Sequence, residues 1–212
     1  MVPGDYNWKN CKCLGSLLDT ETDIQRRKGL AISTINTLQN LFHSHKLTIK
    51  TKVRIFEAYV SSVFLYNSEL WVIETNLCNK IDSFHRRMLR KVLNIKWSII
   101  LKNDEVYRIT NVVKWSETIR KRRLSWLGHL LRLDESTPAR IALREACKVV
   151  KGTVGRHKLT WIELVKKDFR DSRLNLNPDN DNIFFEQLAA FCKDRLIWKK
   201  EVRYMMLNTT NM

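Results

Sequence analysis

Lysines and arginines gather on one side of two amphipathic segments of this sequence, 76–93 and 116–133. In each segment the apolar residues fall in one sector when successive residues are placed about 100° apart, and the cations fall in the opposite sector. Arginine and lysine on a helix face can contact phosphates, so both segments predict a surface for a nucleic-acid backbone. We expect the two cationic faces to share one surface, although a basic helix face is often only a solvated one. The candidate nucleic-acid-binding residues are Lys80, Arg86, Arg87, Arg90, Lys91, Lys121, Arg122, His129 and Arg132.

The net charge points to the same class of partner. The 212 residues include 38 lysines and arginines against 22 aspartates and glutamates, which gives a formal charge of +16. Such an excess predicts a polyanionic partner, with RNA, DNA or an RNA–DNA duplex ahead of an anionic membrane. The longest apolar run, 58–66, is too short to span a bilayer, and the polar N-terminus has no signal peptide. Five scattered cysteines indicate reduced thiols, so we expect an intracellular protein of the nucleus or cytoplasm.

Carboxylates and thiols that could hold a metal ion do not occur at the required spacing. Two-metal polymerisation needs carboxylates that bridge both ions, whereas the acidic pairs at 104–105 and 134–135 fit a helix start and a helix end. Cys11 and Cys13 form a Cys-x-Cys with no second pair nearby, and a structural zinc ion needs four ligands. We therefore expect no catalytic residue, no metal ion and no cofactor in this chain.

Three other features fit a protein core better than a binding site. His85 falls at the edge of the apolar sector of 76–93, which favours a hydrogen-bonded core histidine over a ligand. Most of the seven tryptophans lie at apolar helical positions or next to loops, which favours packing over base stacking. Arg123 points into the middle of the apolar sector of 116–133, where a lone charge is costly. We predict that Arg123 pairs with a carboxylate or extends outward past Leu127.

The small number of turn-forming residues favours an all-α fold. Only six glycines and three prolines are present, which is typical of helices joined by short loops. Ser116 is the expected N-cap of a helix that begins at Glu117, and residues 11–18 are expected to be extended without a partner strand. Apolar periodicity and capping residues predict helices at 22–42, 49–66, 76–93, 104–109, 117–133, 138–146, 161–173 and 183–207.

Five short motifs follow one another along the chain. They are LGS at 14–16, DI and RR at 23–27, LY with ELW at 65–71, FHRR at 84–87, and RRLSWLGH at 122–129. In this order they resemble the region downstream of the polymerase active site in non-LTR (LINE-type, jockey-like) retrotransposon reverse transcriptases. The helix that begins at Trp161 resembles the weaker C-terminal continuation of that family. The sequence departs from the family pattern at Cys13, Asn67 and Leu70, where an aromatic residue, glycine and threonine are usual.

The resemblance implies both an organisation and a function. It implies a remnant of the palm's primer-contacting strand at 1–18, a helical thumb at 19–147, a basic linker at 148–158 and a smaller C-terminal helical region at 159–212. The family's palm and fingers, with the aspartates that hold catalytic magnesium, are expected to be missing. The chain is then a non-catalytic, nucleic-acid-binding fragment of an RNA-directed DNA polymerase. Two alternatives stay open: a truncated gene model of an active endonuclease–reverse transcriptase, and an inert or domesticated helical remnant used for protein contacts.

Overall fold

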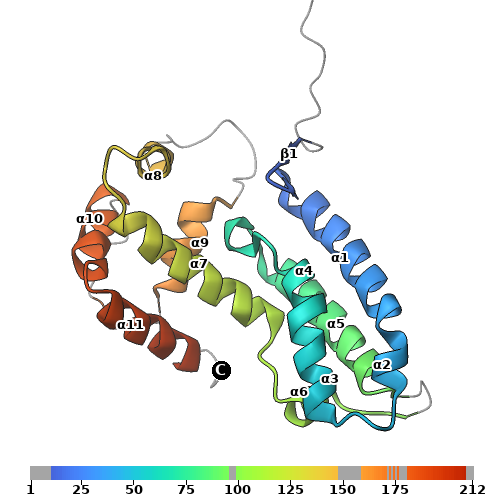
Figure 1. Ribbon diagram of the computed structural model, residues 1–212. Coiled ribbons are helices and arrows are strands. Elements are labelled where there is room, and N and C mark those ends of the chain that lie inside the picture. The colour runs from blue at the N-terminus through green and yellow to red at the C-terminus, as the bar shows by residue number, and fades with distance from the viewer. Residues whose placement is uncertain are drawn as a thin grey trace, which may run out of the picture. The chain divides into compact units, whose positions relative to one another are not determined.

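The computed structural model describes residues 11–95, 99–147, 159–170, 172, 174, 176 and 181–208 (Figure 1). Helices predominate in these residues, so the predicted all-α class is confirmed. The chain groups into two compact units, one of 1–68 with 73–116 and one of 69–72 with 117–212. The predicted linker at 148–158 lies outside the described residues, and the predicted domain boundaries stay a prediction.

Helices make up most of the first unit. The predicted helix at 22–42 is interrupted at Leu38, whose φ of −93° and ψ of 8° lie outside the helical range. Just before this break, the hydroxyls of Thr34 and Thr37 donate to the carbonyls four residues earlier, a pattern that bends helices. The elements of this unit are α1 (Thr20–Thr37), α2 (Gln39–His43), α3 (Ile49–Ile55), the π-helix η2 (Phe56–Ser61), α4 (Ser62–Phe64), α5 (Thr75–Val92) and α6 (Asn103–Thr110).

Stacked aromatic rings form the centre of the first unit. The indole of Trp115 lies 4.2 Å from the Phe64 ring and 4.3 Å from the His85 ring, measured between centroids, with nearly parallel planes. Phe56 stacks on both His85 and Trp115 at about 6 Å. His85 is 1% exposed, so its predicted place in the core is confirmed, but its Nδ1 has none of the predicted hydrogen bonding within the described residues. Trp115 is also fully enclosed, as packing rather than base stacking requires.

Residues 12–17 form a small hairpin. Strand β1 (Lys12–Cys13) pairs antiparallel with β2 (Ser16–Leu17). The two turn residues, Leu14 and Gly15, have φ angles of 46° and 85°, as a two-residue hairpin turn requires. The expectation of an extended piece without a partner is therefore wrong. A glycine in the turn allows the segment to fold back and pair with itself.

Hydrogen bonds from α1 fasten this hairpin to the first unit. The carbonyl oxygen of Gly15 accepts from Arg26 at 2.7 Å and from Arg27 at 2.6 Å. The backbone N–H of Leu17 donates to Asp23 at 3.0 Å. Asp23 and Arg27 are both buried, and the Arg27 guanidinium lies 3.6 Å from the Asp23 carboxylate while donating to Gly15.

The turn at residues 66–67 holds the hairpin from a second side. The Tyr66 hydroxyl donates to the carbonyl of Leu14 at 2.9 Å, and the Asn67 amide donates to the hydroxyl of Ser16 at 3.1 Å. The guanidinium of Arg27 lies 4.6 Å from the centroid of the Tyr66 ring. Three motifs that are far apart in the sequence, at 14–16, 23–27 and 65–67, are thus in direct contact in the fold.

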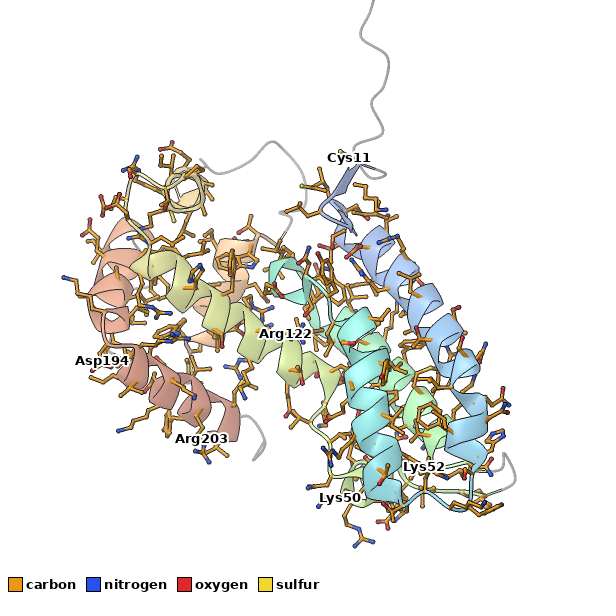
Figure 2. All side chains as sticks on the ribbon, viewed as in Figure 1. Cys11, Lys50, Lys52, Arg122, Asp194 and Arg203 are labelled. Atoms are coloured by element: carbon orange, nitrogen blue, oxygen red, sulfur yellow. The ribbon has the colours of Figure 1, made fainter. Side chains whose placement is uncertain are left out.

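The second unit is helical as well. The predicted helix at 183–207 is interrupted at residues 193–194, where Asp194 accepts from the N–H groups of Leu196 and Ile197 and so caps a new helix. Figure 2 marks Asp194 at this junction. The helix predicted at 161–173 ends at Asp168, and its predicted capping box at Thr160 and Glu163 is confirmed. The helices are α7 (Trp115–Arg132), which begins in the first unit, α8 (Pro138–Cys147), α9 (Trp161–Asp168), α10 (Asp181–Cys192) and α11 (Arg195–Asn208).

The start of α7 is capped differently from the sequence-based expectation. The helix begins at Trp115, and Ser116 donates from its backbone N–H to Asp82 at 3.0 Å and from its hydroxyl at 2.6 Å. The expectation that the Ser116 side chain caps a helix beginning at Glu117 is therefore wrong. The carboxylate of Asp82, on α5, accepts the hydrogen bonds that a local N-cap would otherwise accept.

A buried ion pair ties α7 to α9 within the second unit. Arg123 is 3% exposed, and its guanidinium lies 2.7 Å from the Asp168 carboxylate. Arg120 reaches the other carboxylate oxygen at 3.1 Å. Burial raises the pKa of Asp168, while the two arginines act in the opposite direction. The prediction that Arg123 pairs with a carboxylate is confirmed.

The indole of Trp198 packs on the backbone of α7 at a glycine. The Trp198 N–H donates to the carbonyl of Leu124 at 3.2 Å, and a Cβ added at Gly128 would overlap the indole ring. Trp198 is 3% exposed and belongs to the apolar core of the second unit. A glycine at this helical position is therefore required by close packing and not by backbone conformation.

Candidate nucleic-acid interface

Helix α5 presents cations on one side and apolar residues on the other. Its buried residues include Ile81, Met88 and Leu89, which hold the helix in the core of the first unit. Its candidate binding residues differ in exposure. Lys80, Arg87 and Lys91 are exposed, whereas Arg86 and Arg90 are half-buried.

Lys28, on α1, joins the cations of α5. Its ammonium lies 5.9 Å from the centroid of the Phe84 ring, and the guanidinium of Arg87 lies 5.2 Å from the same ring. Burial lowers the pKa of Lys28, and the positive charges of Arg87 and Lys80 lower it further. We call Lys28, Lys80 and Arg87 the α1–α5 cation cluster. Its like charges repel one another in the absence of a polyanion, and a polyanion would relieve that repulsion.

The sequence analysis did not identify Lys28 as a candidate binding residue, although its position on α1 indicates a partly buried cation. Lys28 lies four residues after Ile24 and three before Ala31, both fully buried, so it occupies the apolar side of α1. A cation at such a position must be covered in part by the neighbouring helix. The same argument led to the prediction for Arg123 and applies equally to Lys28.

The two half-buried arginines of α5 have different surroundings. Arg90 donates to the carbonyl of Leu101 and to the side chain of Asn103, both at 3.0 Å, so it holds the segment before α6. The charge of Arg86 acts on His85: burial lowers the pKa of His85 to about 3, and Arg86 contributes in the same direction. His85 is therefore neutral at physiological pH.

Helix α7 carries the candidate residues of the second unit. Lys121 and His129 are exposed and Arg122 is half-buried; Figure 2 marks Arg122 on this helix. The His129 ring lies 5.2 Å from the Trp126 ring. Arg132 donates to the carbonyl of Cys192 at 3.3 Å, which links it to the end of α10. The candidates of α5 and α7 belong to different units, and a surface shared by both stays a prediction.

The described part of the chain holds no group of three or more histidine, cysteine, aspartate or glutamate residues that could bind a metal ion. The acidic pairs of the sequence act locally instead. Glu105 pairs with Arg108 in α6, and Asp134 accepts from Ser136 after α7. Within the described residues, no helix is long and apolar enough to cross a bilayer.

The chain is similar to an uncharacterized transposon-derived protein of Caenorhabditis elegans. The two are 24% identical over 193 residues, which is 89% of this chain and 66% of the nematode protein. The chain thus spans just under two thirds of the length of that relative. No protein-family model matches the sequence, and no solved structure matches it. The similarity suggests a transposon-related origin without distinguishing a reverse transcriptase from other transposon proteins.

Proposed function

We propose that the chain binds the sugar–phosphate backbone of a nucleic-acid duplex, as the thumb and C-terminal region of a reverse transcriptase from a non-LTR retrotransposon. The observation that carries the proposal is the α1–α5 cation cluster, where Lys28, Lys80 and Arg87 crowd together. A protein gains nothing for its own fold from crowding like charges. Phosphates supply the missing negative charge, and their release of counterions makes the binding favourable.

Two further observations support the reverse-transcriptase part of the proposal. The family-like residues at 14–16, 23–27 and 65–66 are in mutual contact through the hydrogen bonds of Arg26 and Tyr66 to the hairpin. Residues that match a family at separate places and meet in the fold are more informative than the same matches scattered over a surface. The similarity to a transposon-derived protein over most of the chain agrees with this origin.

The proposal assigns different roles to the candidate residues. Lys80, Arg87 and Lys91, with Lys28, contact phosphates from the first unit, and Arg86 adds to the positive field there. Lys121, Arg122 and His129 do so from the second unit. Arg90 and Arg132 contribute positive charge, but their guanidinium groups already donate hydrogen bonds to backbone carbonyls of the protein.

The test compares two double variants of the full chain in binding to a short RNA–DNA duplex. Lys80→Gln with Arg87→Gln removes two charges from the cation cluster. Lys46→Gln with Lys50→Gln removes the same charge from exposed positions of the first unit; Figure 2 marks Lys50 at the start of α3. Fluorescence anisotropy over a range of salt concentrations gives the slope of log affinity against log salt.

Loss of two phosphate contacts lowers the magnitude of that slope by about 1.8, since each contact contributes about 0.9 on a duplex. The cluster variant is expected to show this reduction and weaker binding, whereas the control keeps the wild-type slope. The cluster variant should unfold by heat within about 1 kcal/mol of the wild type, because relief of the repulsion offsets loss of the contact between Arg87 and the Phe84 ring. Equal slopes for both variants would contradict the proposal.

A further inference from the structure

A small pocket is lined by residues from the end of α1, from α2 and from the C-terminal end of α5. Its volume is about 230 Å³, below the roughly 300–1,000 Å³ of sites for drug-sized ligands. Three side-chain amides line it, from Asn36, Gln39 and Asn94, together with the apolar side chains of Ile35 and Phe42. The pocket therefore offers neutral hydrogen-bonding groups beside an apolar wall.

The wall from α5 is fixed by the way that helix ends. Asn94 has a φ of 52°, and its N–H donates to the carbonyl of Lys91 at 3.1 Å. The N–H of Ile95 donates to the carbonyl of Arg90, also at 3.1 Å. These two bonds form a Schellman motif, which sets the direction of the chain after the helix. Asn94 and Ile95 are thus held in place on the pocket wall.

The amide and apolar lining of the pocket suits a planar ring, and Arg90 and Lys91, which also line it, suit the phosphate of the same nucleotide. Amide side chains pair with the edges of nucleobases, and apolar side chains contact their faces. Among the described residues that line the pocket, none is acidic.

Cations lie at the same pocket and continue towards the α1–α5 cation cluster. Lys91, which is exposed, and Arg90, which is half-buried, both line the pocket. Lys91 follows Arg87 by four residues, so the two side chains lie on one face of α5 about one turn apart. A nucleic-acid strand that contacts Arg87 can therefore reach the pocket within one helical turn.

We propose that this pocket receives a single unpaired nucleobase, while Lys91 contacts the phosphate of the same nucleotide. This pocket proposal rests on the proposed function, since the α1–α5 cation cluster must first bind the nucleic-acid strand next to the pocket. It adds a preference that backbone contacts alone do not give. A duplex with an extruded or bulged nucleotide binds more tightly than a fully paired one.

The experiment measures binding of the full chain to three short hairpins: one fully paired, one with a single bulged nucleotide, and one with an abasic bulge at the same place. RNA and DNA versions of each hairpin identify which sugar the site accepts. Asn36→Phe fills the pocket from α1. Asn40→Phe is the matched control, because Asn40 is exposed on α2 and does not line the pocket.

The wild type and Asn40→Phe are expected to bind the bulged hairpin at least about five-fold more tightly than the paired and abasic ones, the smallest gain expected from one stacked base. Asn36→Phe is expected to lose this preference and keep its affinity for the paired hairpin. Should Asn36→Phe fail to fold, Gln39→Glu, which places a negative charge at the exposed rim, tests the same loss.

Equal binding of all three hairpins by the wild type, or a preserved preference in the pocket variants, would overturn the pocket proposal. Salt-dependent binding of the paired hairpin would still support backbone contact in either case. No binding of any hairpin at low salt would instead overturn the proposed function itself, and the pocket proposal with it.

Discussion

The neutral histidine in the aromatic core makes folding stability depend on pH. His85 packs against the rings of Phe56 and Trp115, and burial lowers its pKa to about 3 from a usual value of 6.5. Below pH 6.5 the unfolded chain binds a proton at this residue, whereas the folded chain does not until pH approaches 3. Stability from His85 is therefore complete above pH 6.5 and is lost progressively between pH 6.5 and 3.

The size of the loss follows from the two pKa values. Between pH 7 and pH 4.5 the unfolded state gains about 2.5 kcal/mol from protonation of His85, given 1.36 kcal/mol for each pH unit below 6.5. The variant His85→Phe cannot take up this proton. It keeps an aromatic ring against Trp115 and removes the His85 Nδ1 atom, which is buried without a hydrogen-bond partner among the described residues. At pH 7 we expect its stability to lie within about 1 kcal/mol of the wild type.

The assay is urea unfolding followed by tryptophan fluorescence, at pH 7 and pH 4.5, for the wild type, His85→Phe and His45→Phe. His45 is exposed and serves as the matched control. The wild type and the control should lose about 2.5 kcal/mol more than His85→Phe over this range. If all three proteins show the same pH dependence, the buried neutral histidine is not its source and the argument from burial fails.

Three further substitutions test the packing and capping described above. Gly128→Ala is expected to destabilise the protein by about 1–2 kcal/mol, since overlap with Trp198 outweighs the gain in helix propensity. Gly29→Ala, in open space on α1, is expected to stabilise it by up to about 1 kcal/mol; thermal unfolding of both variants gives the comparison, and equal effects would contradict it. Asp82→Ala is expected to cost about 1–2 kcal/mol, because the start of α7 loses the acceptor of two hydrogen bonds from Ser116. An unchanged unfolding midpoint for Asp82→Ala would show that this cap contributes nothing.

Apolar periodicity predicted where the helices lie but not where they break. The interruption at Leu38 falls inside an unbroken apolar pattern, and the one at 193–194 falls where Asp194 caps a second helix. Such breaks depend on single side chains that form hydrogen bonds with the backbone, and the spacing of apolar residues contains no information about them. The hairpin at 12–17 was missed for a related reason, since a two-residue turn needs only one well-placed glycine.

The charged residues show which features of this fold can be predicted from the sequence and which cannot. The position of Arg123 in an apolar sector required a partner, and the fold supplies Asp168, which lies 45 residues further along the chain. The sequence could state the need because burial of a lone charge is costly, but it could not choose among the acidic residues. The candidate binding residues present the opposite case. The exposure of Lys80, Arg87 and Lys91 follows from the helix pattern, whereas the crowding with Lys28 depends on how α1 packs against α5. The need of a buried charge for a partner can be predicted from its position in a helix. Which residue becomes that partner depends on how the helices pack. The charges that act on Lys28 in the α1–α5 cation cluster are those of Arg87 and Lys80, both positive, which is why we look for the counter-charge of the cluster in a nucleic acid.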